Sequence, residues 1–265
     1  MAIADHYSGA DIAGRVLAAA GPSPTPEKLA AIDHFHGGGV AATRELVAML
    51  EPRRGEHLLD LGSGIGGPAR WIAATFDCRV TGIDLTPSFC RAAEALNAAT
   101  GMADRVRIVE GSALDLPFDD ASFDRAYSQN VVMNIADKPR FYSEALRVLK
   151  RGGVLALSNL AAGPAGPPHF PVPWAATAAT SFLATAEATR RELEQAGFAI
   201  VRFEDTTQKS MAMRQAFRAK LESEGLPALG PHVFIGERMR EYSINAARSQ
   251  EEGRLVSLEI LLRRP

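Results

Sequence analysis

The chain has 265 residues, of which 46% are hydrophobic and 23% charged, and its formal net charge at pH 7 is −2. This length and composition suit one large domain, or a domain with a cap. No basic excess is available to neutralise phosphates, so a nucleic acid is not an expected partner. No apolar run approaches the ~18 residues that span a bilayer, and the start of the chain has no apolar signal core, so neither membrane insertion nor secretion is expected.

The two cysteines, Cys78 and Cys90, form neither a CxxC pair nor a disulfide framework. Two buried thiols are typical of a protein in a reducing compartment. We therefore predict a cytoplasmic protein, and the sequence leaves its oligomeric state open.

The first 50 residues are expected to be largely helical, because Ala-rich segments around 8–20 and 39–50 carry apolar residues at helical spacing. Between these segments, the stretches GPSPTPEK and DHFHGGG are expected to form turns. Five short apolar or alternating runs then indicate buried strands, at 57–61, 79–84, 105–110, 123–129 and 153–159. Helical patterns separate these runs, at 67–76, 87–99 and 137–150.

The last part of the chain continues this alternation, except for two segments. A helix is expected at 187–197, and strands are expected at 198–204 and 253–264. Residues 207–250 form a helical insertion, and residues 160–174 contain too much Pro and Gly for a regular element.

Strands that alternate with helices indicate right-handed crossovers and a doubly wound α/β fold with a mainly parallel sheet. We predict a core of residues 51–206 and 251–265 that binds a cofactor. Residues 1–50 would form a helical lid, and residues 160–184 and 207–250 would form cap segments over a substrate pocket.

A glycine-rich turn follows the first expected strand. Gly62, Gly64 and Gly67 satisfy the G-x-G-x-x-G pattern, and Pro68 lies in the first turn of the next helix. Glycine permits a tight turn and a close approach by a ligand, and the helix offers free N–H groups. Asp84 ends the next strand, where a carboxylate can accept hydrogen bonds from both hydroxyls of a ribose. This order predicts an adenosine-like ligand at the carboxyl ends of the strands.

A dinucleotide such as NAD is one candidate ligand, but Asp60 argues against it. This carboxylate stands two residues before the first glycine, where it would repel a pyrophosphate and attract an amino group or a sulfonium. The Tyr-x-x-x-Lys pairing of many NAD enzymes is also missing, because no tyrosine has a lysine four residues later. A NAD(P)-dependent oxidoreductase remains an alternative.

Four stretches resemble the class I S-adenosylmethionine-dependent methyltransferases: DLGSGIGG, VTGIDLTP, EGSALDLPFDDASFD and LKRGGVLALSN. The resemblance covers roughly residues 56–160. The flanking DHFHGGGVAATREL and GPPHFPVPWA are similar to a small-molecule branch that includes sarcosine/dimethylglycine methyltransferases and natural-product tailoring enzymes. The resemblance implies a Rossmann-like sheet of seven strands with the last antiparallel, and transfer of a methyl group from S-adenosylmethionine to a small metabolite, giving S-adenosylhomocysteine.

The resemblance also implies roles for particular residues in cofactor binding. Asp60 would lie near the methionine amino group, Asp84 would hold the ribose, and Leu85 would flank the adenine. Ser112 stands where many relatives have an aspartate that accepts from the adenine amino group. The remaining implied cofactor residues are Gly62, Ser63, Gly64 and Gly66 along the backbone turn, Ala113 and Leu114 at the adenine edge, and Gln129, with Asn130, at the methionine end facing the substrate.

Oxygen and carbon nucleophiles usually need a general base, whereas a neutral amine does not. His36 is the main candidate base, with His34 and His169 behind it. Relatives often have Gln-His where this chain has Gln129-Asn130, and aspartate where it has Asn159. Because amides do not accept protons at neutral pH, these positions favour an acceptor that needs no base, a base elsewhere such as His36, or a protein that binds the cofactor without efficient transfer. No metal site is expected, despite the His-x-His spacing of His34 and His36.

Several cap residues are candidates for contact with the substrate: Tyr7, Phe35, His36, His169 and Trp174. Met211, Met213 and Met239 could line an adaptable apolar cavity. Ordinary packing between cap and core is the alternative for each aromatic residue and methionine. An apolar cap favours a partly apolar acceptor, and its identity and the reacting atom (O, N or C) stay open.

Overall fold

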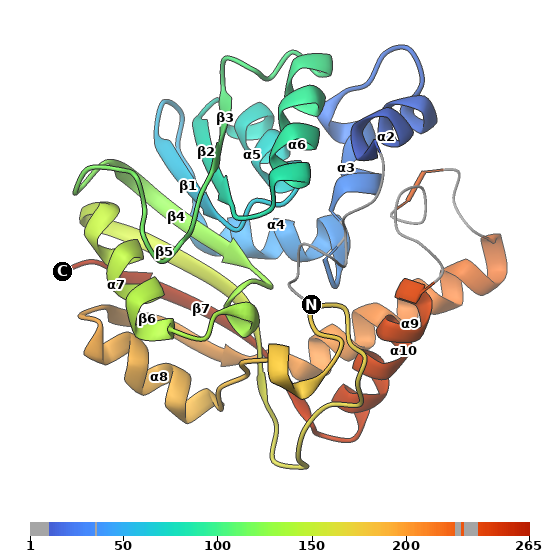
Figure 1. Cartoon of the computed structure of the whole chain (residues 1–265), viewed down its shortest axis with the longest axis vertical. Helices are drawn as coiled ribbons and strands as arrows, with labels where there is room; N and C mark the ends of the chain where they lie inside the picture. The colour runs from blue at the N-terminus through green and yellow to red at the C-terminus, as the bar shows by residue number, and fades with distance from the viewer. Residues whose placement is uncertain (1–10, 35, 226–228, 231–237) are drawn as a thin grey trace.

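The computed structural model of the protein describes residues 11–34, 36–225, 229–230 and 238–265. Its centre is a seven-stranded sheet with the strand order β3-β2-β1-β4-β5-β7-β6 (Figure 1). The strands are β1 (His57–Leu61), β2 (Arg79–Asp84), β3 (Val106–Glu110), β4 (Phe123–Gln129), β5 (Leu149–Ala162), β6 (Ala199–Asp205) and β7 (Leu255–Arg263).

The strands from β3 to β5 pair in parallel, and β7 pairs antiparallel with both β5 and β6. This confirms the predicted doubly wound sheet with an antiparallel last strand. The chain passes outward from β1 to β3 and then returns to β4 on the other side of β1. The carboxyl ends of β1 and β4 therefore meet at a topological switch point, where ligands bind in open α/β sheets.

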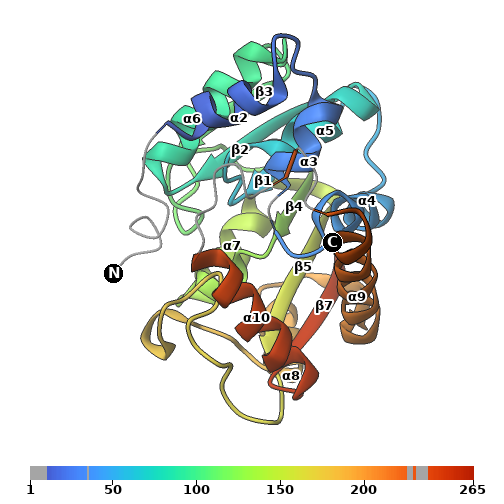
Figure 2. The ribbon, with the colours of Figure 1, turned by 90° about the vertical axis from the view of Figure 1, so that its right-hand side faces the viewer.

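The α-helices are α2 (Ile12–Ala20), α3 (Pro26–Asp33), α4 (Gly39–Leu50), α5 (Gly67–Phe76), α6 (Pro87–Ala99), α7 (Lys138–Val148), α8 (Ala186–Gln195), α9 (Thr207–Glu224) and α10 (Arg238–Glu251). Short 3-10 turns occur at η1 (Val132–Asn134) and η2 (Ala178–Thr180). Figure 2 shows the sheet with α4 and α9 on one side and α7 on the other. In the described part of the chain, no helix is both long and apolar enough to cross a membrane.

Two apolar clusters, one on each face of the sheet, form the main core. The first includes Leu59, Leu157 and Ile260 of the sheet and Phe141 of α7. The second lies on the opposite face, where α4, α5 and α6 pack on strand residues such as Leu58 and Tyr127. Strands that are covered on both faces read as near-continuous apolar runs, which is why the sequence located them closely.

Helix α3 refines one sequence-based expectation, because the stretch GPSPTPEK was read as rich in turns. Pro26 occupies the first turn of this helix, where no N–H is needed, and the Thr25 hydroxyl caps it by accepting from the Lys28 N–H at 3.3 Å. Leu29 and Ile32 are fully buried. The turn residues are thus the N-terminal cap of a helix.

The segments predicted as lid and cap surround the core. Helix α3 packs on α5 and α2 on α6, and α9 lies beside α10 (Figure 1). Part of segment 160–184 forms an apolar cluster with Met133 of η1 and Leu255 of β7. Their roles as lid and cap remain predictions.

Candidate active site

The glycine turn after β1 has the backbone geometry that only glycine adopts readily. Gly62, Gly64 and Gly66 have φ of 83°, 54° and 75°. The Gly62 N–H donates to the Ile83 carbonyl at 2.9 Å, which ties the turn to the end of β2. Gly66 then caps α5, whose N-terminus faces the turn.

Two of these glycines are also required by the packing of the protein itself. A Cβ on Gly62 would lie 2.4 Å from a methyl carbon of Val131, and a Cβ on Gly67 would lie 2.6 Å from Oδ1 of Asp33. The sequence assigned the absence of side chains to the approach of a ligand. The structure adds a second cause, which is close packing: Gly62 lies against Val131, just after β4, and Gly67 lies against Asp33 at the end of α3.

Asp84 links the two strand ends at the ligand position. Its Oδ2 accepts from the Gly64 N–H at 2.8 Å, and its Oδ1 accepts from the Thr86 N–H at 2.9 Å. Burial raises the pKa of this carboxyl, while the two N–H donors lower it in part. A carboxylate has about four acceptor positions, so each oxygen retains a lone pair for a further donor such as a ribose hydroxyl.

Asp60 is buried under the glycine turn, with 3% of its surface exposed. Its Oδ2 accepts from the hydroxyl of Tyr127, a fully buried residue on β4, at 2.9 Å. Burial raises the pKa of Asp60 to about 7, and the nearby Asp84 adds to this effect, whereas the Tyr127 hydroxyl opposes it. A cation beside Asp60 would favour the ionised form, so the site suits a ligand with an amino group or sulfonium.

The predicted adenine side is formed by Leu85 and the loop after β3. The Leu85 side chain is 72% exposed, which is unusual for leucine and suits a contact with a planar ligand. The Ser112 hydroxyl accepts from the Leu114 N–H at 3.1 Å, which closes the loop into a local turn. Ala113 and Leu114 pack against the core below it.

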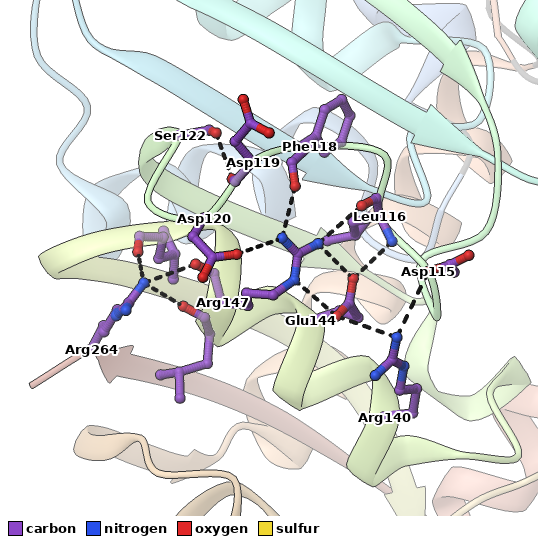
Figure 3. Close-up of polar contacts among 12 residues, drawn as sticks. Asp115, Leu116, Phe118, Asp119, Asp120, Ser122, Arg140, Glu144, Arg147 and Arg264 are labelled. Atoms are coloured by element: carbon purple, nitrogen blue, oxygen red, sulfur yellow. Dashed lines mark hydrogen bonds and ion pairs between the residues drawn. The ribbon is translucent and has the colours of Figure 1, made fainter.

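Charged residues of α7 hold this loop in place (Figure 3). Arg140 Nε donates to the Leu114 carbonyl at 2.8 Å, and Glu144 Oε2 accepts from the Leu116 N–H at 2.9 Å. Arg147 donates to the carbonyls of Leu116 and Phe118 and forms ion pairs with Glu144 and Asp120, both at 2.8 Å. Side chains of α7 therefore hold the backbone of the loop that contains the predicted adenine edge.

The expected substrate side begins at the end of β4. Gln129 projects toward α4, and Asn130 follows it with a left-handed φ of 55°, a conformation that asparagine tolerates better than most residues. The Asn130 N–H donates to the Ser158 carbonyl at 2.8 Å, which fixes this residue against β5. Asn159 is 5% exposed, and its Oδ1 has no hydrogen-bond partner among the described residues.

A histidine pair meets Gln129 through a threonine that sequence reasoning missed. Thr43 of α4 is fully buried, and its Oγ1 lies 3.0 Å from His34 Nδ1, 3.1 Å from His36 Nε2 and 3.2 Å from Gln129 Oε1. Burial lowers the pKa of His36 and lowers that of His34 to about 3. Both rings are therefore neutral at pH 7, and a neutral imidazole can accept a proton.

A buried ion pair fixes the lid beside the glycine turn. Arg70 of α5 contacts Asp33 of α3 at 2.7 Å, and both side chains are 1% exposed. Arg70 also donates to Asn97 Oδ1 at 2.8 Å. Burial outweighs the attraction of Arg70 and raises the pKa of Asp33 to about 6. Because Asp33 precedes His34, this pair holds the histidine segment close to α5.

The other predicted substrate contacts have different surroundings. His169 Nε2 lies 2.6 Å from Glu252, and the His169 N–H donates to the Ser249 hydroxyl, so this residue ties its segment to α10. Trp174 lies in the apolar cluster with Met133, and its Nε1 donates to Ser181 at 3.0 Å. Tyr7 and Phe35 lie outside the described residues.

The predicted methionines all lie on the two cap helices. Met211 and Met213 are on α9, and a Cβ added to Gly38 of the lid would lie 3.7 Å from Met213 Cε. Met239 is on α10, and its side chain is outside the described part. Within the described residues, no group of three or more His, Cys, Asp or Glu side chains could hold a metal ion.

Residues 59–157 match a family model described as a methyltransferase domain. The O-methyltransferase resE of Aspergillus sclerotiorum is 30% identical over 216 residues, which make up 80% of this chain and 78% of resE. The chain belongs to the class I S-adenosylmethionine-dependent methyltransferases. The methyltransferase also resembles the O-methyltransferase cnsE of Penicillium expansum, at 31% identity over 69% of this chain and 66% of cnsE.

Solved structures agree on the fold of this methyltransferase. The [4+2]-cyclase SpnF superimposes with a TM-score of 0.68 at 23% identity, over 92% of this chain and 98% of SpnF. At this level of identity, the likeness concerns the fold and not the reaction. The oxidoreductase alternative receives no support from these relatives.

The chain's own residues fit S-adenosylmethionine. Asp84 retains acceptor capacity beside the turn, Leu85 is exposed next to it, and the buried Asp60 favours a cation. Sequence reasoning missed Tyr127 and Thr43, which contact Asp60 and His36, respectively. No local motif marks a residue whose partner lies far along the chain.

Proposed function

We propose that this methyltransferase methylates a hydroxyl oxygen of a small, partly apolar metabolite, and that His36 is the general base. One observation carries the proposal: a half-buried, neutral histidine is linked through the Thr43 hydroxyl to Gln129 at the end of β4, where the family resemblance expects the acceptor. The amides at Asn130 and Asn159 favoured an acceptor that needs no base. His36 provides the base that these two positions lack.

We assign the binding of the methyl donor to residues that follow the carboxyl ends of β1, β2 and β3. Asp84 accepts from the ribose, Asp60 faces the amino group, and Leu85, Ser112, Ala113 and Leu114 flank the adenine. The backbone from Gly62 to Gly66, including Ser63, lies under the methionine part. When bound, S-adenosylmethionine supplies an electrophilic methyl group on a sulfonium.

On the acceptor side, the protein aligns a hydroxyl and removes its proton. His36 Nδ1 would accept the hydroxyl proton, while the oxygen would take the methyl group from the sulfonium, whose carbon–sulfur bond would break to leave S-adenosylhomocysteine. The side chains of Gln129 and Asn130 orient the hydroxyl, since amides donate and accept hydrogen bonds without taking up protons. Alignment of this kind contributes several kcal/mol to lowering a barrier.

Two further observations support an oxygen acceptor with an apolar part. The relatives resE and cnsE are both named O-methyltransferases. The cluster around Trp174, Met133 and Val172 provides an apolar wall next to η1, directly after Asn130. Trp174 is assigned to this wall, and His169 is reassigned to holding the segment against Glu252. Tyr7 and Phe35 stay candidates for closing the lid.

A cytoplasmic setting is part of the same proposal, because both cysteines are free buried thiols. Burial raises the pKa of the Cys78 thiol to about 11, so this thiol is neither a nucleophile nor a metal ligand at pH 7. The proposal includes no nucleic-acid partner.

Matched acceptors test the proposal. Purified enzyme and S-adenosylmethionine would be incubated with pairs that differ only in the nucleophile, such as phenols and the corresponding anilines, and products would be identified by mass spectrometry. We expect methyl ethers, and a roughly 100-fold lower kcat for His36→Gln. His57→Gln is the control, because His57 contacts a threonine, Thr81, at 2.8 Å at the start of β1. Methylation of amines alone, or a His36→Gln enzyme with unchanged kcat, would contradict the proposal.

A further inference from the structure

We propose that Thr43 is a positioning residue that holds His36 with its proton on Nε2, so that Nδ1 is free to act as the base. The assignment of Nδ1 as the base rests on the proposed function. The tautomer itself follows from the hydrogen bonds of the protein alone.

The hydroxyl group of Thr43 has close polar neighbours from three segments of the chain. Thr43 Oγ1 has three nitrogen or oxygen neighbours: His34 Nδ1 at 3.0 Å, His36 Nε2 at 3.1 Å and Gln129 Oε1 at 3.2 Å. Thr43 is fully buried, so water does not replace any of them. One atom of α4 thus contacts His34 directly after α3, His36 in the loop before α4, and Gln129 at the end of β4.

A hydroxyl has one proton to donate and two lone pairs to accept with. The amide oxygen of Gln129 accepts only, so the Thr43 proton must point to it. Both imidazole nitrogens must then donate to Thr43. This places one proton on His34 Nδ1 and one on His36 Nε2.

The consequence for His36 is a lone pair on Nδ1. Among the described residues, this nitrogen lies near the Gly37 carbonyl, at 3.3 Å, which cannot donate a hydrogen bond. When Nδ1 receives a proton, it can donate to this carbonyl, and the imidazolium is then held at both nitrogens. The Gly37 carbonyl accordingly raises the pKa of His36 against the effect of burial.

His34 serves as a fixed neutral donor in this arrangement. Burial is the largest cause of its low pKa, His36, Arg70 and Arg44 lower it further, and a hydrogen bond with the Gly67 backbone opposes these effects in part. It therefore donates to Thr43 across the neutral pH range without competing for the transferred proton. Gln129 Nε2 has no partner among the described residues and stays available for the acceptor or the cofactor.

The tautomer can be measured before the acceptor is known. Long-range ¹H–¹⁵N correlation spectra of histidine-labelled enzyme, saturated with S-adenosylhomocysteine, show which ring nitrogen carries the proton, and His36→Gln assigns the signals. We expect His36 Nε2 to be protonated in the wild type. A proton on His36 Nδ1 instead would overturn the inference, because it requires Gln129 to donate to Thr43 with its amide reversed.

Variants distinguish the role of the Thr43 hydroxyl group from a general effect of the substitution on packing. Thr43→Val should move the His36 proton to Nδ1, where the Gly37 carbonyl accepts it, and Thr43→Ser should restore the wild-type pattern. Gln129→Leu should cause the same shift without altering Thr43, because the hydroxyl is then free to donate to His36 Nε2. Thr81→Val is the matched control, since it removes the hydroxyl beside His57 and should leave His36 unchanged.

Kinetics with an active acceptor distinguish this inference from the proposed function. Thr43→Val should lower kcat roughly 10- to 100-fold, while the affinity for S-adenosylhomocysteine stays within about twofold. If His36→Gln is inactive but Thr43→Val keeps the wild-type tautomer and kcat, the role of Thr43 is wrong and the base stands. If His36→Gln is fully active, the proposed base is wrong, whereas the spectra still decide the tautomer.

Discussion

The donor side and the acceptor side of this methyltransferase are built in different ways. The predicted donor side consists of a backbone turn and two carboxylates between Asp60 and Thr86, and its hydrogen bonds join residues at most 21 positions apart (Gly62 to Ile83), apart from that of Tyr127. The acceptor side depends on the contact between Thr43 and Gln129, which are 86 positions apart. A short segment thus contains the predicted donor site, whereas the predicted acceptor site combines residues of α4 and β4 that lie far apart in the chain.

This difference suits an enzyme family with one donor and many acceptors. The donor site can be kept by a local motif while the lid and cap change around it. The ion pair between Asp33 and Arg70 couples the two sides, because it joins the lid to the helix that starts at the glycine turn. Substitutions can break this coupling or affect either side alone.

The largest expected effect comes from separating the two sides. Asp33→Ala leaves the Arg70 guanidinium buried without its partner, so the free energy of unfolding should fall by about 3–5 kcal/mol. Urea unfolding followed by circular dichroism measures this change. Glu27→Ala is the control, because Glu27 is an exposed acid on the same helix. Equal, small losses for both variants would show that the ion pair does not hold the lid.

The next effect is confined to the donor side. Asp84→Ala removes both predicted bonds to the ribose, and hydrogen bonds to a charged group contribute about 1.5–3 kcal/mol each, so the affinity for S-adenosylhomocysteine should fall at least ~100-fold. Isothermal titration calorimetry gives the Kd. Glu94→Ala removes an exposed charge from α6 and should leave the Kd unchanged. Near-wild-type affinity of Asp84→Ala would place the ribose elsewhere.

A smaller effect is expected from the support behind the adenine loop. Arg140→Met removes the donor to the Leu114 carbonyl, and because the arginine side chain is 49% exposed, we expect only a severalfold weaker Kd for S-adenosylhomocysteine. Arg151→Met, an exposed arginine on β5, provides the comparison. If the two variants bind equally well, the loop holds its shape without Arg140.

A further effect is a pH dependence of donor binding. The pKa of Asp60 is raised to about 7, so in the free protein the carboxyl becomes neutral as the pH falls below this value. The ligand's amino group remains cationic there, and the lost attraction should weaken binding by at most about tenfold per pH unit. Titrations between pH 5.5 and 8, as rough limits, measure it. Asp60→Asn should flatten the profile, and an equally steep profile in this variant would assign the effect to another group.

The same division explains what the sequence predicted. Buried strands and the glycine turn have local signatures, so the sheet and the position of Asp84 at a strand end followed from the sequence, as did the strand limits to within two residues, except for β5, which is longer at both ends than the predicted 153–159. Helix α3 was missed because Pro26 and Thr25 serve equally well in a turn and in a helix cap. Thr43 carries no local signal, since a threonine within a helix is usually unremarkable, and its partners come from distant segments. Whether His36, Asn130 and the cap aromatics act as predicted stays a prediction.

A crystal structure of the complex with S-adenosylhomocysteine tests the central claim most directly. The account predicts the ribose hydroxyls within about 3 Å of the Asp84 carboxylate, the amino group beside Asp60, and the sulfur facing the side occupied by Gln129 and His36. A ligand whose ribose lies away from Asp84, or whose sulfur faces away from the histidine pair, would contradict it.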